Sequence, residues 1–252
     1  MRFAYCSAFA AALSFSVGPV HAGLDSLLGK VDAASDVAKA ATVSDREIMD
    51  SSRQMMALQD KKAKVAPPGN KYADRLAALT AKHVKEDGLQ LNFKVYLSPT
   101  VNAFATPDGS IRFYSGLMDM MNDDELRGII GHEIGHTKLR HSVAAVKTAY
   151  MASAGRKAAA SSKGALGQIA ESDLGAMFES VVNAQFSQTQ ETASDDYGFQ
   201  FMKKHKYDFK AMESAFRKFE KLDGGKGSIT SSHPGSSERA DRMKARAGNA
   251  SK

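Results

Sequence analysis

Cysteine is nearly absent from this sequence, because Cys6 is the only one among 252 residues. It lies within residues 1–22, which have the features of a cleavable export signal: an early Arg2 and an apolar stretch that ends in the small residues of Val20-His21-Ala22. Cleavage after Ala22 leaves no cysteine, so disulfide bonds are excluded from the mature chain. Cys6 also has too little apolar sequence before it for lipid attachment, and no lipid anchor is expected.

Long apolar runs are missing after the signal. No later stretch approaches the roughly 18 uninterrupted apolar residues of a membrane-spanning helix. We therefore expect an exported protein of the periplasm, and the sequence leaves peripheral association with a membrane open. A one-sided cluster of positive charge is missing too, because the formal net charge of +6 is scattered along the chain. A nucleic-acid partner would gather Lys and Arg beside stacking aromatic residues, and is not expected.

Composition and turn residues divide the chain into a signal at 1–22, a helical extension or linker at 23–66, and a main domain at 67–250 that starts at Pro67-Pro68-Gly69. The main domain is predicted to be α+β, mainly helical with a small sheet. Its first helix, at 72–86, would bury Leu76, Leu79 and Val84 and end at Asp87-Gly88. The other expected elements are strands at 91–97, 101–104 and 111–114, the last two forming a hairpin or meander; a helix from 123, which Gly128 and Gly131 weaken; two helices between 142 and 185 joined near 158–167; helices at 191–205, 208–222 and 237–246; and a loop at 224–227.

The segment His132-Glu133-Ile134-Gly135-His136 carries the clearest chemical signal. Histidines four residues apart lie about 40° apart around a helix axis, one turn apart, and at that spacing both rings can bind one zinc ion. Glu133 is then offset toward the open side of the ion, where it can move a proton from a water molecule to a leaving amine. The alternative is two surface histidines, but Ile129 and Ile130 would turn this face toward a core.

A catalytic zinc ion needs a third protein ligand and keeps a fourth position for water. The metzincin pattern would place Gly at 139 and His at 142, where this chain has Leu139 and Ser142, and His141 would lie on the opposite side of a continuing helix. The best candidate for the third ligand is Glu191, which lies four residues before Asp195 on a predicted helix. One carboxylate can bind zinc while the other accepts the N–H of a ligand histidine. The alternative is a solvated helix face.

Four segments of the main domain carry a resemblance to a known family. They are Val101-Asn102-Ala103-Phe104-Ala105-Thr106-Pro107-Asp108-Gly109, Tyr114-Ser115-Gly116-Leu117, Asp124-Glu125-Leu126 and Gly131-His132-Glu133-Ile134-Gly135-His136. Together they resemble peptidase family M48, especially its soluble periplasmic members, from about Tyr72 to Arg239. The resemblance implies a zincin-like fold of the gluzincin type and a zinc metalloendopeptidase with one ion per chain.

The resemblance also implies roles for single residues. His132, His136 and Glu191 would bind the zinc ion, Glu133 would act as the base, and Asp195 would hold a ligand histidine from behind. The two departures from the family pattern are Gln188, where Arg is frequent, and Ser194, where Ala is usual. Neither removes a metal ligand, but each could alter how the second helix is held.

Two more regions match the family pattern. Asn102 and Ala103 are implied to lie on an edge strand that pairs with the substrate backbone. His233 and Arg239 match a late His-Pro…Arg segment, in which the histidine approaches the metal or the transition state and the arginine lies near the site. The alternative for His233 is a turn residue before Pro234.

The expected function is hydrolysis of peptide bonds in exported proteins. A backbone-pairing edge selects extended chain rather than particular side chains, so unfolded or misfolded envelope proteins are the expected substrates. The alternative from another class is a zinc-stabilised chaperone or binding protein without proteolysis. A latent enzyme, with its cleft plugged by residues 224–227 and the His233 segment, would resemble this alternative in a simple assay. Glu133 discriminates between the two, because a binding protein does not need it.

Overall fold

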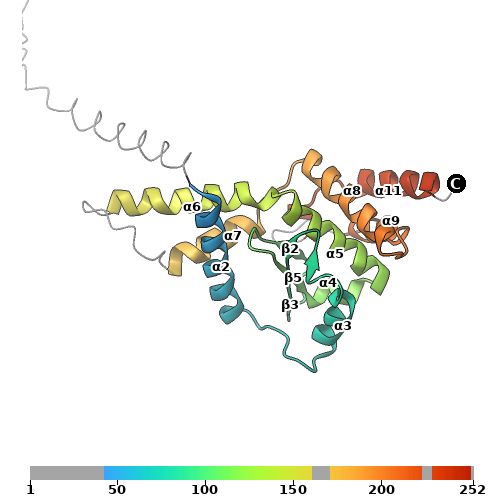
Figure 1. The fold of residues 1–252 in the computed structure, drawn as a ribbon, viewed down its shortest axis with the longest axis horizontal. Coiled ribbons are helices and arrows are strands. Elements are labelled where there is room, and N and C mark those ends of the chain that lie inside the picture. The colour runs from blue at the N-terminus through green and yellow to red at the C-terminus, as the bar shows by residue number, and fades with distance from the viewer. Residues whose placement is uncertain (1–42, 161–170, 223–228, 251–252) are drawn as a thin grey trace, which may run out of the picture. The chain divides into compact units, whose positions relative to one another are not determined.

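The computed structural model describes residues 43–160, 171–222 and 229–250, which all belong to the unit from Thr42 to Lys252 (Figure 1). The predicted signal at 1–22, the extension up to residue 42, most of the connection near 158–167 and the loop at 224–227 lie outside the described residues. The helices are α2 (Asp45–Lys62), α3 (Lys71–Thr80), α4 (Ser115–Met120), α5 (Asp123–Lys138), α6 (His141–Ala160), α7 (Glu171–Val182), α8 (Gln188–Lys204), α9 (Ala211–Phe219), α10 (Ile229–Ser232) and α11 (Ser236–Ala250). The strands are β1 (Lys85–Glu86), β2 (Leu89–Gln90), β3 (Asn92–Tyr96), β4 (Ala103–Ala105) and β5 (Ser110–Tyr114).

This composition of elements confirms the predicted α+β class, mainly helical with a small sheet. None of the helices in the described ranges combines the length and the apolar character needed to cross a membrane.

The central sheet has three strands in the order β3-β5-β4, so β4 lies at an edge. β5 pairs antiparallel with β4, with Ala103 opposite Phe113, which confirms the predicted hairpin. On its other side β5 runs parallel to β3. The hairpin turn requires Gly109, whose φ is +85° and whose added Cβ would lie 2.1 Å from the carbonyl oxygen of Gln90. This edge of the sheet packs against α5.

Helix α5 begins at a capping box, in which Asn122 accepts the backbone N–H of Glu125 and Glu125 accepts that of Asn122. The helix then runs unbroken through Gly128 and Gly131. At Gly131 an added Cβ would lie 2.7 Å from the Phe201 ring and 3.1 Å from the Gly198 Cα, both on α8. The missing side chain therefore lets α5 and α8 pack closely enough for their polar residues to meet.

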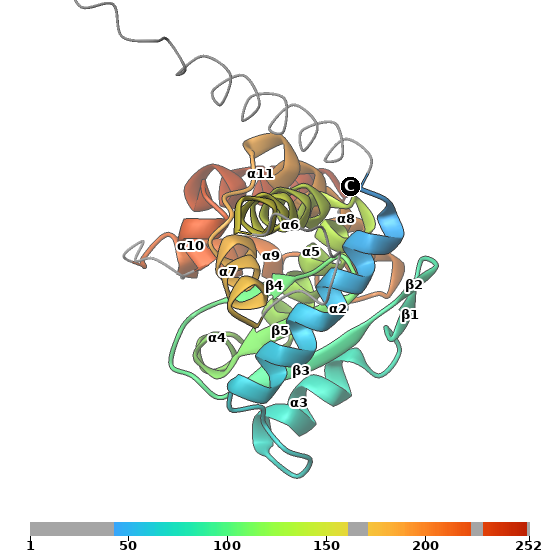
Figure 2. The same ribbon diagram turned by 90° about the vertical axis from the view of Figure 1, so that its left-hand side faces the viewer.

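Two apolar clusters stabilise the unit. The larger joins the sheet with α3, α5, α8, α9 and α11, and the smaller joins α2 with α6 and α7. Met55 and Met56 of α2 are 1% and 2% exposed in the smaller cluster. In the last turn of α2, which runs beside the strands in Figure 2, Asp60 accepts hydrogen bonds from Arg112 of β5 at 2.9 and 3.0 Å. The sequence predicts a main domain that starts at residue 67; α2 lies before that boundary, within the compact unit from Thr42 to Lys252.

The helix predicted at 72–86 is wrong beyond Thr80, where α3 ends. Val84, expected on the apolar face, is 48% exposed. The following residues form the hairpin β1–β2, whose turn residues Asp87 and Gly88 have φ of 46° and 83°. Two consecutive positive φ angles define a type I′ turn, for which Asp-Gly is strongly preferred. The Asp-Gly pair is therefore a hairpin signal here, and not the end of a helix.

Candidate metal centre

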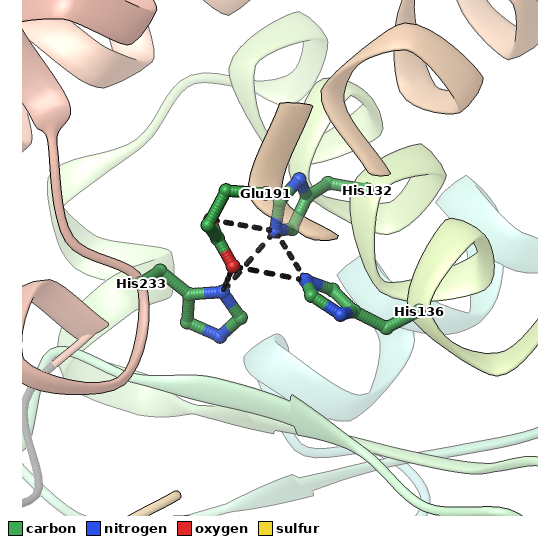
Figure 3. A group of neighbouring side chains, drawn as sticks. All are labelled: His132, His136, Glu191 and His233. Carbon is green, nitrogen blue, oxygen red and sulfur yellow. Dashed lines mark hydrogen bonds and ion pairs between the residues drawn. The ribbon is translucent and has the colours of Figure 1, made fainter. Parts of the chain in front are cut away.

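Four polar side chains from three segments converge inside the unit (Figure 3). His132 and His136 lie one turn apart on α5, with their Nε2 atoms 2.9 Å apart. Glu191, in the first turn of α8, places its Oε1 3.3 Å from His136 Nε2. His233, which follows α10, places its Nδ1 3.0 Å from Glu191 Oε1 and 3.2 Å from His132 Nε2. All four residues are at most 3% exposed.

The start of α8 fixes the position of Glu191. Ser187 and Gln190 form a capping box there, so the helix begins one residue after Ser187 and Glu191 lies in its first turn. Close packing of α8 against α5 at Gly135 sets the distance between the two helices. An added Cβ on Gly135 would lie 3.1 Å from both the Cα and the carbonyl oxygen of Ser194. Local capping and a glycine contact together bring the carboxylate to the two histidines.

Asp195 lies behind the first histidine. Its Oδ1 is 2.9 Å from His132 Nδ1, so His132 turns Nε2 toward the other three side chains. Arg239 of α11 binds Asp195 with two nitrogens, Nη2 at 2.6 Å and Nε at 2.9 Å, and its Nη1 lies 2.6 Å from Glu191 Oε2. One guanidinium thus ties together the two carboxylates of α8.

The buried carboxylates have opposite pKa shifts. Burial raises the pKa of Glu133, and its Oε1 has no hydrogen-bond partner among the described residues. Burial alone would also raise the pKa of Glu191, but the charges of His233 and Arg239 hold it far below the usual range. Asp195 likewise has a strongly lowered pKa despite its burial, mainly because of Arg239. Glu133 is therefore the carboxylate that accepts a proton most readily.

The pKa values of His136 and His233 are shifted in opposite directions. Burial lowers the pKa of His136 well below its usual value, so its ring is neutral, as a metal ligand must be. For His233 burial alone would lower the pKa, but the carboxylates of Glu191 and Glu133 raise it overall.

These residues fit a zinc ion. The Nε2 atoms of His132 and His136 face each other at 2.9 Å, where only one proton can lie between them, and two further donor atoms crowd the same point. Imidazole nitrogens with one carboxylate are the donors that zinc prefers in peptidases. His233 would complete four protein donors, a closed set that is typical of zinc held without an open position.

The two residues predicted to pair with the substrate backbone, at the start of β4, are buried. Asn102 and Ala103 are both 0% exposed, and the Ala103 N–H donates to the Asn102 side chain at 2.9 Å. The carbonyl of Val101 accepts the N–H of Ile229, the first residue of α10, at 3.0 Å. The segment that leads to His233 therefore contacts the chain at Val101, two residues before β4 and next to the edge predicted to bind substrate.

Three neighbours of the centre carry no sequence signal. His141 Nδ1 lies 3.1 Å from His136 Nδ1, because the chain turns at Arg140, with φ of 61°, instead of continuing α5. The Phe186 ring packs on His136 with centroids 4.0 Å apart, and Arg242 Nη2 lies 2.5 Å from Asp195 Oδ2. His141 does not belong to the converging donor group, in agreement with the sequence analysis, although not by way of the expected continuous helix.

A helix-borne His-Glu-x-x-His joined by a glutamate from a second helix is the donor set of a zinc metallopeptidase. The profile of peptidase family M48 matches residues 70–247. The metalloprotease YcaL of Escherichia coli strain K12 is 40% identical over 210 residues, which cover 82% of this chain and 83% of YcaL. The metalloprotease LoiP of the same strain is 37% identical over 238 residues, 93% of this chain and 94% of LoiP. The mitochondrial metalloendopeptidase OMA1 of Arabidopsis thaliana is 28% identical over 158 residues, 61% of this chain and 31% of OMA1. The chain belongs to peptidase family M48, as predicted.

Proposed function

We propose that this metallopeptidase hydrolyses peptide bonds with Glu133 as its proton carrier and one zinc ion held by His132, His136 and Glu191. When bound in such a site, zinc supplies Lewis acidity toward water and the peptide carbonyl. Glu133 takes a proton from the attacking water and passes it to the leaving amine. The observation that supports this role best is the place of the Glu133 carboxylate beside the converging donors: the residue is 1% exposed, its Oε1 lies 3.7 Å from His233 Nε2 without a hydrogen bond, and burial raises its pKa.

The other residues of the centre would position these groups. Asp195 orients His132 through Nδ1, and Arg239 holds Asp195 and Glu191 at a fixed separation. His233 closes the donor set, and Ile229 of the same segment donates its N–H to the carbonyl of Val101, just before the edge strand β4. Productive binding of a substrate then requires this segment to move away from both places.

Unfolded or misfolded envelope proteins, met in the periplasm after export, are the proposed substrates. β4 lies at an edge of the sheet, so pairing with its backbone would select an extended chain without regard to its side chains. Casein and other unfolded proteins should therefore be cut. Efficient cleavage of one short defined peptide, with casein left intact, would contradict this substrate class.

The variant Glu133→Gln tests the proton role. It keeps the size of the side chain and all the zinc donors, so zinc content should match the wild type while casein cleavage falls about 10²–10⁴-fold. Glu179→Gln, on the exposed face of α7, is the matched control and should be fully active. Undiminished cleavage by Glu133→Gln would rule out the proposed mechanism.

The closed donor set gives one reason to keep a second candidate function. Four buried protein donors are typical of structural zinc, so a zinc-stabilised chaperone or binding protein also fits the centre. Such a protein would suppress aggregation of an unfolded envelope protein equally well in wild type and in Glu133→Gln. Loss of the protective effect in the variant would exclude this candidate.

A further inference from the structure

A second group of metal-ligating side chains lies at the far end of α8 from Glu191. His83 Nδ1 is 2.8 Å from Glu86 Oε2, and His205 Nε2 is 3.1 Å from Glu86 Oε1. One donor atom from each of the three residues lies within 4.8 Å of the others, a convergence that the described part of the chain shows elsewhere only at the metal centre. His83 and Glu86 are 1% and 4% exposed, so the group is built into the interior and is not a surface coincidence.

We propose that His83, Glu86 and His205 form a second metal site, which binds a divalent transition ion of the zinc class. Donor atoms around a tetrahedral zinc ion are about 3.3 Å apart when the bonds are 2.0–2.1 Å long. Here the two histidine nitrogens lie 2.8 and 3.1 Å from different oxygens of Glu86, and one donor atom from each residue lies within 4.8 Å of the others. Small shifts of the three side chains would therefore admit an ion. Three protein donors leave one position for water.

The surroundings of His83 match those of a ligand histidine. Its second nitrogen, Nε2, lies 2.9 Å from the Tyr207 hydroxyl, which fixes the ring with Nδ1 toward Glu86. Its ring also meets that of His205 edge-on, with centroids 4.5 Å apart. Burial lowers the pKa of His83, so the ring is neutral and can bind a cation at neutral pH.

Glu86 supplies the negative charge. Burial alone would raise its pKa, but hydrogen bonds from Lys204 and His83 hold the pKa below its usual value, so the group is a carboxylate. Lys204 Nζ lies 2.6 Å from Glu86 Oε1 and 2.7 Å from Asp87 Oδ1. The lysine therefore competes with an ion for Glu86, and it is the side chain that sets the affinity of the site.

Lys204 is free to give way. Its side chain is 52% exposed, and Asp87 offers it a partner after it leaves Glu86. A cavity of about 240 Å³ beside the group is lined by Glu86, Asp87, Tyr197, Gln200, Phe201 and Lys204. This cavity gives an ion a path from solvent and gives its water ligand a place to lie.

The position of the group suggests what an ion would do there. His83 and Glu86 precede the tight turn of β1–β2, and His205 is the C-cap of α8. An ion bound to all three would clamp the end of α8 to the hairpin. The same helix carries Glu191 in its first turn, so the clamp would stabilise the helix that completes the metal centre without taking part in the reaction.

The test is the zinc content of the purified protein after equilibration at micromolar buffered free zinc. Two ions per chain are expected for the wild type and one for His205→Gln, whose side chain is 22% exposed and tolerates replacement. His136→Ala removes the other ion, so the two sites are scored separately. A failure of peptidase activity does not affect this measurement.

A second variant makes the test sharper. Lys204→Met removes the competing ammonium group and should lower the Kd for the second zinc ion at least tenfold, whereas Lys203→Met, on the neighbouring exposed lysine, should leave it unchanged. A single zinc ion in wild type and in Lys204→Met alike would overturn the proposal, and these side chains would then form a hydrogen-bonded clamp only. Two ions that persist in both His205→Gln and His83→Gln would overturn it as well, because the second ion would lie elsewhere.

Discussion

Arg239 is the residue whose loss should cost the most stability near the metal centre. It is 6% exposed and contacts both Glu191 and Asp195, which are 1% and 0% exposed. Replacement by Met keeps much of the volume but leaves two buried carboxylates without their shared partner. Breaking a buried ion pair by removing one member costs about 3–5 kcal/mol. For a chain of this size each kcal/mol shifts Tm by roughly 2–4 °C, so Arg239→Met should melt roughly 6–20 °C below the wild type.

Thermal unfolding followed by circular dichroism, with zinc and with a chelator, measures this effect. The loss should be smaller with zinc, because a bound cation beside Glu191 replaces part of the missing charge. Arg239→Lys keeps the positive charge but lacks the guanidinium fork that binds Asp195 through two nitrogens. Its Tm should therefore lie between those of the wild type and Arg239→Met. Arg246 lies on α11 like Arg239 but forms a more exposed ion pair, with Asp196 of α8. Arg246→Met should therefore cost less than about 1 kcal/mol of stability. A Tm for Arg239→Met within roughly 2 °C of the wild type in chelator would refute the reasoning.

Helix packing, acid stability and closure of the centre can each be tested with one variant. Gly135→Ala places a Cβ 3.1 Å from α8, and it should lower the free energy of unfolding in urea by about 1–3 kcal/mol and weaken zinc binding. Gly175→Ala, with nothing within 4 Å of the added Cβ, should raise that free energy by about 0.5–1 kcal/mol. Equal stabilities of the two variants would contradict this account. Burial alone would raise the pKa of Asp60, but hydrogen bonds from Arg112 hold it low, so its stabilisation is present above the unfolded pKa of about 3.9 and lost as pH falls through the folded pKa. Asp60→Asn should therefore be roughly 3 kcal/mol less stable at neutral pH and equal to the wild type in strong acid; a difference that persists there would exclude this origin. His233→Ala opens the donor set and should cut casein faster while keeping its zinc; slower cleavage would instead place His233 at the transition state.

The parts of the centre that could be predicted are those with a local pattern. The spacing of His132 and His136 fixes their shared face on α5, and the hairpin before it follows from a turn signal between two apolar runs. Glu191 and Asp195 form a pattern of their own, but 55 residues separate Glu191 from His136. Before the fold, their spacing made Glu191 only the best candidate for the third ligand, with a solvated helix face as the alternative, and the resemblance to peptidase family M48 assigned it to the same ion as His132 and His136.

The rest depends on contacts between distant segments. Phe186 and Arg242 reach the centre only because α5, α8 and α11 pack together, and nothing in their own neighbourhoods marks them. The burial of Met55 and Met56 could not be predicted either. Methionines spaced among polar residues are equally typical of a peripheral helix and of a helix packed into the core. For Val84 the error is the reverse: burial was predicted, but the residue is exposed. Its helical spacing extended the predicted helix into a segment where the Asp87-Gly88 turn forms a hairpin instead.

The order of these residues along the chain has a consequence for biosynthesis. His233 and Arg239 come after all the other members of the centre, within the last 20 residues of the sequence. A partly synthesised chain that ends before them holds both histidines of α5 and both carboxylates of α8, but not the guanidinium that balances those carboxylates. Assembly of the centre therefore waits until residues 233–239 have been synthesised, and copies truncated before them lack part of the metal centre.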